Sequence, residues 1–346
     1  MIAIDGSHGE GGGQILRLSV ALSAVTQEPI KVTNIRRNRP NPGLKPQHVM
    51  AINSVAEICH AQVEGNTVGS SMITFYPGGI KGGTYSFNIG TAGSITLVLQ
   101  ACIIPSLFAT HKITISITGG TDVKWAPPWD YFNHVFLPHL QNMNIKIRGH
   151  LICRGYYPRG GGKATMVIDP VDTLRPFIPK ETPTIQVKGI VNMAHLPSHI
   201  GDRIKKSAEE TLAAQHISAD IDIVLEQSSS VGVGLVLWTC NGSILGADCL
   251  GEKGISSEKV GSLAASRLLS EIQSGATLDM YAVDQMLPYL ALSKKGFFFC
   301  RELSSHASTE MWLIKKFLKK DFSIQPSGVL KKVTLVDNHD VSISTA

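Results

Sequence analysis

The sequence predicts an α+β fold, built from a repeated α/β unit with a smaller α/β domain inserted into it. Three observations support this prediction. Short apolar strands alternate with helical patterns along most of the 346 residues. A strand, a glycine turn and an apolar helix follow one another twice in the first half of the chain. A segment of different texture then begins after a proline-rich stretch.

The repeated unit is visible at three places. Residues 4–6 lead through a glycine-rich turn into an apolar helix that starts near Gln14. Residues 87–90 lead in the same way into an apolar helix over residues 95–101, about 84 residues further on. A third apolar helical stretch over residues 283–292 precedes a strand over residues 296–300. We therefore expect three copies of one unit, the alternative being a chance likeness between ordinary strand-to-helix turns.

The inserted segment has its own cycle of elements. We expect strands over residues 185–191 and 219–225, helices over 201–215 and 257–271, and a hairpin of strands over 232–240 and 242–249. Insertions succeed at exposed loops, so residues 183–276 are expected to form a small domain. Residues 1–182 and 277–346 would then form the large domain.

Composition limits the class of protein. Hydrophobic residues make up 43% and charged residues 17%, which is typical of a folded soluble chain. The net charge of +5 is compatible with an anionic partner without establishing one. The six cysteines form no C-x-x-C pair, which argues against a cysteine zinc site or a disulfide scaffold. With no signal-peptide pattern and no apolar run of about 18 residues, we expect a cytoplasmic protein without a membrane span.

The first candidate site is the turn at residues 9–14, which reads Gly-Glu-Gly-Gly-Gly-Gln. Glycines here would let backbone N–H groups face an anion at a helix N-terminus. Glu10 suits such a place if Mg²⁺ neutralises both the carboxylate and a phosphate. The Gly-Lys-Ser/Thr ending of a Walker A loop is missing. The alternative is a tight turn in which Glu10 interacts with the helix dipole.

A basic loop follows at residues 36–48. It holds four cations within ten residues and three prolines that stiffen it. Arginine offers a bidentate fork to phosphate, so this pattern favours phosphate binding over a merely solvated charged surface.

Two further glycine clusters are less specific. Residues 119–128 contain Gly-Gly-Thr-Asp and Ala-Pro-Pro, which could form a rigid wall for stacking a base. Residues 156–162 form a turn that displays Arg159. Both are equally compatible with a plain loop.

The most informative residue is His306. It follows the strand over residues 296–300 and precedes a predicted helix over residues 309–318, for which Ser308 is a suitable N-cap. We therefore expect His306 in a short polar loop just outside a helix N-terminus. The dipole would keep the imidazole neutral, as a nucleophile must be, and would favour an incoming phosphate. The alternative is a capping or hydrogen-bonding histidine.

Asp284 and Gln285 lie near the start of the apolar helix that precedes this strand. They could orient a histidine or a metal. They could equally be cap residues without a catalytic role.

Taken together, these segments resemble the RNA 3′-terminal phosphate cyclase family over nearly the whole chain. The specific motifs are the Gly-Glu-Gly-Gly-Gly-Gln turn, the Arg-x-x-Arg-Pro-x-Pro-Gly-Leu loop with Gln-His, Gly-Gly-Thr-Asp…Ala-Pro-Pro, Asp-Gln and Ser-His, in family order. The resemblance implies three repeated units, each a four-stranded sheet with two helices, similar to units in enolpyruvyl transferases. It also implies a small inserted α/β domain.

The resemblance further implies an ATP-dependent ligase-type enzyme of RNA processing. Such an enzyme converts an RNA 3′-terminal phosphate to a 2′,3′-cyclic phosphodiester through a covalent histidyl-AMP and an RNA-adenylate. The substrates would be ATP and RNA with a 3′-terminal phosphate, with Mg²⁺ or Mn²⁺ as the metal.

By motif position, the resemblance assigns His306 as the nucleophile and Glu10 as a metal ligand. The phosphate-binding or RNA-end residues would be Arg17, Arg36, Arg39, Gln47 and His48. The nucleotide-binding residues would be Gln100, Pro127, Pro128, Tyr281, Asp284 and Gln285.

Three rival interpretations remain. A non-catalytic relative in ribosomal RNA processing would lack the matching histidine, which this chain has in His306. An enolpyruvyl transferase would share the repeated unit without adenylylating a protein histidine. A plain RNA-binding module would not consume ATP. The sequence leaves the oligomeric state open.

Overall fold

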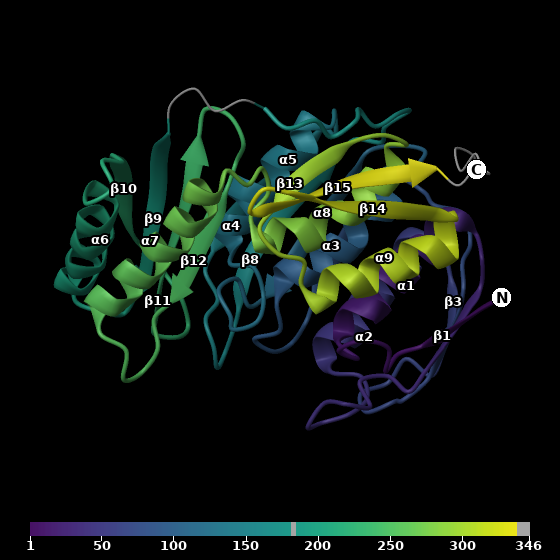
Figure 1. The fold of residues 1–346 in the computed structure, drawn as a ribbon. Coiled ribbons are helices and arrows are strands. Elements are labelled where there is room, and N and C mark those ends of the chain that lie inside the picture. The colour runs from purple at the N-terminus through teal and green to yellow at the C-terminus, as the bar shows by residue number, and fades with distance from the viewer. Residues whose placement is uncertain (181–184, 338–346) are drawn as a thin grey trace, which may run out of the picture.

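The structure is a computed structural model that describes residues 1–180 and 185–337. Four β-sheets are joined by helices, which confirms the predicted α+β class. Figure 1 shows the sheet of β9 to β12 (residues 186–250) with α6 (Ser198–Ala213) and α7 (Ser257–Ser274) at one end of the molecule. Helices α1 (Gly13–Thr26), α2 (Pro46–Ile58) and α9 (Ser305–Leu318) lie toward the other end.

The first unit forms one four-stranded sheet in the order β1-β2-β4-β3. Strands β1 and β2 are parallel, and the other pairs are antiparallel. Its elements are β1 (Ile2–Asp5), α1 (Gly13–Thr26), β2 (Ile30–Thr33), α2 (Pro46–Ile58), β3 (Gln62–Glu64) and β4 (Ile73–Tyr76). A parallel pair needs a crossover, which α1 supplies.

The second unit repeats this arrangement in the order β5-β6-β8-β7, again with a parallel first pair. Its elements are β5 (Gly83–Asn88), α3 (Ile95–Ser106), β6 (Ile113–Gly119), α4 (Trp129–Tyr131), the π-helical turn η1 (Phe132–Phe136), α5 (Leu137–Asn142), β7 (Ile147–Cys153) and β8 (Gly162–Ile168). Helix α3 begins where Ser94 accepts a hydrogen bond from the backbone N–H of Leu97.

The third unit has a sheet of three strands in the described part of the chain, one fewer than the resemblance implies, in the order β13-β15-β14. Its elements are α8 (Met280–Leu292), β13 (Phe297–Cys300), α9 (Ser305–Leu318), β14 (Lys320–Ser327) and β15 (Leu330–Asp337). The place of a first parallel strand is taken by an isolated bridge between Phe177 and Gly296. Prolines on both sides of Phe177 lack the N–H groups that a longer ladder needs.

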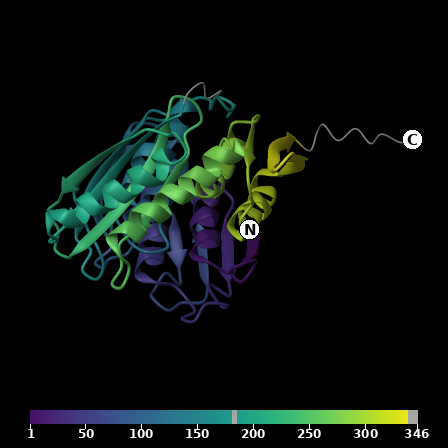
Figure 2. The same cartoon turned by 60° about the vertical axis from the view of Figure 1, so that its left-hand side comes forward.

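The sheet of order β10-β9-β11-β12 matches the inserted segment. Its elements are β9 (Gln186–Ala194), α6 (Ser198–Ala213), β10 (Ala219–Leu225), β11 (Gly232–Cys240), β12 (Gly246–Leu250) and α7 (Ser257–Ser274). The predicted strands, helices and antiparallel hairpin are all present. Figure 2 shows α6 and α7 side by side along this sheet. They enclose a hydrophobic core separate from the one that the three units share.

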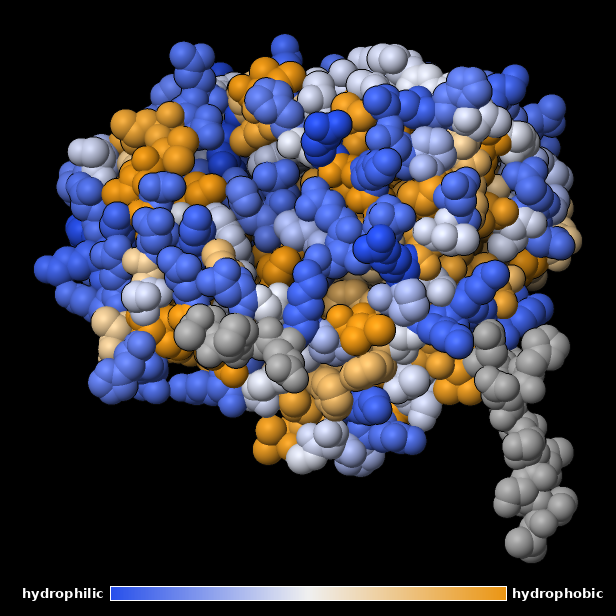
Figure 3. Space-filling view, turned by 90° about the horizontal axis from the view of Figure 1, so that it is seen from above, coloured by the Kyte–Doolittle hydropathy of each residue, from blue (hydrophilic) through white to orange (hydrophobic). Residues whose placement is uncertain are grey.

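Helix packing brings distant parts of the sequence together. Helix α9 packs against α1 and α8, and α1 also packs against α3. The N-terminal glycine turn therefore lies beside the start of α9. On the face shown in Figure 3, hydrophobic residues form separate groups among hydrophilic ones, as on an ordinary solvated surface. Over the described residues, none of the helices is long and apolar enough to cross a bilayer.

Candidate active site

Helix α9 begins earlier than the sequence pattern predicts. Ser304, not Ser308, is the N-cap, because its hydroxyl accepts a hydrogen bond from the backbone N–H of Ala307 at 3.0 Å. The Ser304 hydroxyl in turn donates to Asp284 at 2.7 Å, which fixes its orientation. His306 therefore lies in the first turn of α9 and not in the loop before it.

The imidazole of His306 is half-buried and faces the glycine turn. Its Nε2 lies 3.2 Å from Oε2 of Glu10. Burial lowers the pKa of His306, with help from the cations Arg17 and Arg39, while Glu10 opposes the shift. The ring is therefore neutral at neutral pH, as a nucleophile requires.

Glu10 is the centre of the contacts around His306. Its carboxylate accepts hydrogen bonds from the hydroxyl of Ser305 and from Nη2 of Arg39, the latter at 3.0 Å. The Ser305 hydrogen bond is the largest cause that lowers the pKa of Glu10, and His306 and Arg39 add to it. Glu10 is thus an anion that joins the glycine turn to the start of α9, where Ser305 is 295 residues further along the chain.

The glycine turn brings the backbone close to other site residues. A Cβ atom at Gly13 would lie 2.2 Å from Nε2 of His48, so no larger residue fits without displacing that ring. At Gly12, an added Cβ would meet Arg39 at 3.3 Å and His306 at 3.8 Å. The open backbone of this turn is what lets these side chains converge.

The predicted phosphate-binding arginines lie near His306 and His48. Arg17 on α1 is half-buried, and burial lowers the pKa of its guanidinium to about 10, against the attraction of Glu310. Burial and the neighbouring Arg39 also lower the pKa of Arg36. Cations that repel one another in this way are well placed for an anionic ligand.

His48 and Gln47 lie at the start of α2. His48 is only 4% exposed, and its Nδ1 accepts a hydrogen bond from the backbone N–H of Lys45. Burial lowers the pKa of His48 to about 3, and Arg17, Arg36 and Lys45 contribute. Gln47 accepts a hydrogen bond from the backbone N–H of Ser94, which connects α2 to the start of α3.

A second group of predicted residues lies around the start of α8. Gln100 donates to Gln285 at 2.6 Å, and Gln285 donates to the backbone carbonyl of Tyr281 at 2.9 Å. The ring of Tyr281 is exposed and stands edge-on to Tyr131, with 6.5 Å between the ring centroids.

The alternative that Asp284 and Gln285 are cap residues is wrong. Asp279 is the N-cap of α8 and accepts hydrogen bonds from the backbone N–H groups of Tyr281 and Ala282, both at 3.0 Å. Burial raises the pKa of Asp284 to about 7, against the hydrogen bond from Ser304. Asp284 therefore contacts Ser304 at the start of α9, whereas its neighbour Gln285 contacts Gln100.

Pro127 and Pro128 lie in the loop before α4. The carbonyl of Pro127 accepts a hydrogen bond from the hydroxyl of Thr96 at 2.8 Å, and Pro128 takes the N-cap position of α4. Thr96 lies one helical turn before Gln100 on α3, so the proline loop and the amide pair are held by the same helix.

Sequence reasoning missed Ser304 and Glu310, and it gave Gln14 no role of its own. Glu310 is 6% exposed, follows His306 by one helical turn, and accepts a hydrogen bond from Gln14 at 2.6 Å. Burial raises the pKa of Glu310 well above its ordinary value. A carboxylate on the apolar side of the predicted helix was the signal that could have found it.

Glu10 is the carboxylate that the glycine turn offers to a metal ion. Among residues 1–180 and 185–337, no group of three or more His, Cys, Asp or Glu side chains could hold a metal ion. Glu10 alone fits a Mg²⁺ ion that takes most of its ligands from phosphate and water.

Comparisons with known proteins identify relatives over nearly the whole chain. The family model described as RNA 3′-terminal phosphate cyclase matches residues 8–324. A protein of that name from Nitrosospira multiformis is 45% identical over 338 residues, which cover 96% of each chain. One from Pyrococcus furiosus is 44% identical, covering 96% of this chain and 97% of its own. One from Methanosarcina mazei is 43% identical, covering 97% of this chain and 100% of its own.

Proposed function

Because the chain belongs to the RNA 3′-terminal phosphate cyclase family, we propose that it closes an RNA 3′-terminal phosphate to a 2′,3′-cyclic phosphodiester at the expense of ATP, with His306 as the nucleophile. The arrangement that best supports this proposal is a neutral histidine in the first turn of a helix, beside an anionic Glu10 and a group of arginines. The relatives from Nitrosospira multiformis and Pyrococcus furiosus support cyclase chemistry in general. The histidyl intermediate rests on His306 itself.

The proposed reaction has three displacements. A ring nitrogen of His306 attacks the α-phosphorus of ATP, and the bond to pyrophosphate breaks. An oxygen of the RNA 3′-phosphate then attacks that phosphorus, and the histidine leaves. Finally the 2′-hydroxyl attacks the RNA phosphorus, loses its proton and expels AMP. Dividing the reaction replaces an oxide leaving group by AMP, which is the benefit of covalent catalysis.

The side chains near His306 have complementary roles in this scheme. Attack requires a ring nitrogen without a proton, and the lowered pKa of His306 favours the neutral ring, which has one such nitrogen. Arg17, Arg36 and Arg39 would neutralise phosphate oxygens as charge moves between them. Glu10 would provide the carboxylate ligand for a Mg²⁺ or Mn²⁺ ion, which supplies further charge neutralisation when bound.

The second group would bind the nucleoside. Pro127, which is partly exposed, and the exposed ring of Tyr281 offer apolar surfaces for the adenine, with Gln100 and Gln285 as hydrogen-bonding partners. Pro128 is buried at the start of α4 and would support the loop rather than contact the base. Asp284 would keep α9 in place through Ser304. Gln47 and His48 would support the loop beside the RNA terminus.

The first step can be tested by labelling. The protein is incubated with α-³²P-ATP and Mg²⁺, beside His306→Ala and a matched surface variant, His216→Ala. Acid-labile, alkali-stable label on the wild type and His216→Ala, but not on His306→Ala, is expected. With γ-³²P-ATP no label should remain, because pyrophosphate leaves.

Label that persists on His306→Ala would reject His306 as the nucleophile. No label on any folded, ATP-binding sample would reject the mechanism and favour a non-catalytic role in ribosomal RNA processing.

A further inference from the structure

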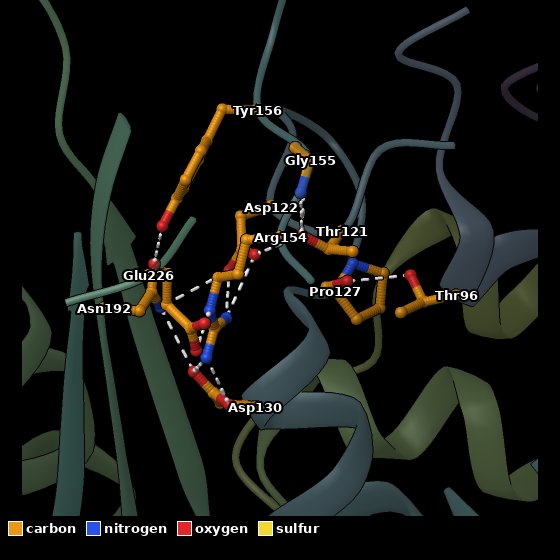
Figure 4. A network of polar contacts seen from close by, with 10 residues as sticks. All are labelled: Thr96, Thr121, Asp122, Pro127, Asp130, Arg154, Gly155, Tyr156, Asn192 and Glu226. Carbon is orange, nitrogen blue, oxygen red and sulfur yellow. Dashed lines mark hydrogen bonds and ion pairs between the residues drawn. The ribbon is translucent and has the colours of Figure 1, made fainter. Parts of the chain in front are cut away.

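A buried guanidinium lies where the second unit meets the inserted sheet. Arg154, in the turn between β7 and β8, is 3% exposed. Its Nη1 donates to both oxygens of Asp122 at 3.2 and 3.0 Å, and its Nη2 donates to both oxygens of Asp130 at 2.9 and 2.8 Å. Figure 4 shows the two carboxylates on either side of this one side chain.

The two aspartates are the ends of one loop, residues 122–130, which we call the proline loop because Pro127 and Pro128 lie in it. The backbone closes its base, where the N–H of Trp129 donates to the carbonyl of Thr121 at 2.9 Å. Arg154 therefore holds both ends of the loop that carries the two prolines.

On the side away from Arg154, the proline loop contacts α3, which carries one of the residues proposed to bind the nucleoside. Pro127 accepts the hydrogen bond from Thr96 on α3, and α3 also carries Gln100. The loop is thus held between Arg154 on one side and α3 on the other (Figure 4). Trp125 lies in the middle of the loop and is 96% exposed. The contacts that fix the loop are therefore those at its base and at Pro127.

The inserted sheet completes the surroundings of Arg154. Asn192 on β9 donates to Asp122 at 3.4 Å and to Asp130 at 3.1 Å. Glu226, just after β10, accepts a hydrogen bond from Nε of Arg154 at 3.3 Å. The hydroxyl of Tyr156 donates to Asn192 at 2.7 Å. Each polar group of this cluster is therefore partnered, as buried charges require.

We propose that Arg154 is a positioning residue for nucleotide binding, which acts through Asp122 and Asp130 to hold the partly exposed Pro127 against the base. This inference rests on the proposed function, in which Pro127 contacts the adenine of ATP. Lysine cannot replace arginine here, because only the planar fork can serve two carboxylates at once.

The inference is tested with Arg154→Lys, which keeps the charge but loses the fork. The matched control is Arg203→Lys, at an exposed Arg203–Glu258 pair of the inserted segment. The labelling reaction is followed against ATP and GTP concentration. We expect the ATP concentration for half-maximal labelling to rise about tenfold, since small misplacements at a site are costly. The maximal rate should stay within about threefold and the preference for ATP over GTP should fall.

Loop position has a readout that needs no activity. Trypsin cleavage after Lys124, an exposed residue of the proline loop, should become faster in Arg154→Lys, while cleavage after Lys81, an exposed residue of the loop between β4 and β5, stays unchanged. Asp130→Asn, a near-isosteric change of one anchor, should move both readouts in the same direction if Arg154→Lys does not fold.

Three outcomes would overturn the inference. One is an unchanged ATP requirement and unchanged ATP preference in a folded Arg154→Lys protein, even if its melting temperature falls. Unchanged cleavage after Lys124 is the second. The third is a wild-type protein that takes no label and binds no ATP, which rejects the proposed function itself and so is distinguishable from the other two.

Discussion

The protonation state of His306 sets the pH range in which the proposed first step can run. Burial lowers its pKa, so the neutral ring persists below pH 6.5, where an ordinary histidine is half protonated. We expect the initial labelling rate to stay near its plateau at pH 6.5 and to fall at lower pH. Rates measured between pH 5 and 8 would check this.

Glu10 provides an internal control for that profile. Its charge raises the pKa of His306, so Glu10→Gln should move the acid limb to still lower pH. Added metal should restore part of any loss in maximal rate if Glu10 is also a metal ligand. An acid limb that moves to higher pH would contradict the electrostatic assignment.

Single residues show both the reach and the limits of sequence reasoning. The sequence pointed to three features: glycines clustered around a carboxylate, arginines in a proline-rich loop, and a histidine between a strand and a helix. The convergence of Glu10, Arg39 and His306 depends on packing between α1 and α9, which no local pattern encodes. Glu310 was overlooked because the apolar spacing around it predicts a core side chain.

Helix α9 carries His306, the proposed nucleophile, and the start of this helix is capped by Ser304. Ser304→Ala removes the N-cap hydrogen bond and should lower the free energy of unfolding by about 1 kcal/mol. Because His306 lies in that first turn, the labelling rate should fall as well. Urea unfolding and the labelling assay measure the two effects.

Ser308→Ala is the matched control. Ser308 makes only a 3.4 Å hydrogen bond to the carbonyl of Ser304, so its loss should affect stability and labelling less. Equal effects of the two substitutions would show that the cap at Ser304 is not what fixes His306.

Element boundaries were predictable where one pattern dominates. The alternating strand over residues 219–225 and the first hairpin strand over 232–240 coincide with β10 and β11. The start of α9 was misplaced because Ser304 and Ser308 are both good caps. The choice between them is made by Asp284, which approaches from α8 and is 20 residues away in the sequence.

The two large hydrophobic cores allow a test of whether the inserted segment is a separate domain. We propose that residues 183–276 form a unit of their own, with Leu237 in its core and Leu22 in the core of the three units. Leu237→Ala and Leu22→Ala should each cost about 2–5 kcal/mol of stability. Calorimetry should show each substitution lowering a different unfolding transition. A single transition lowered by both would reject independent domains and indicate that contacts between the two units couple them, such as those of Arg154 and the cluster of Tyr131, Val135 and Val236.

At the scale of the whole molecule, the sequence predicted the first two repeated units well but not the three-stranded sheet of the third. The first two units share strand order and a parallel first pair, which matches the echo in the sequence. In the third, the inserted segment separates Phe177 from α8, and prolines restrict pairing to one bridge. No local pattern in the proline-rich stretch predicts that partner.

That bridge has a consequence for how the chain is made. Phe177 and Gly296 are about 120 residues apart in the sequence. During synthesis the first two sheets have all their strands by Ile168, whereas Phe177 must wait for its partner to be translated. At cellular elongation rates this delay is roughly 6 to 24 seconds. The site around His306 therefore forms only after the strands of the first two sheets and of the inserted segment have been made.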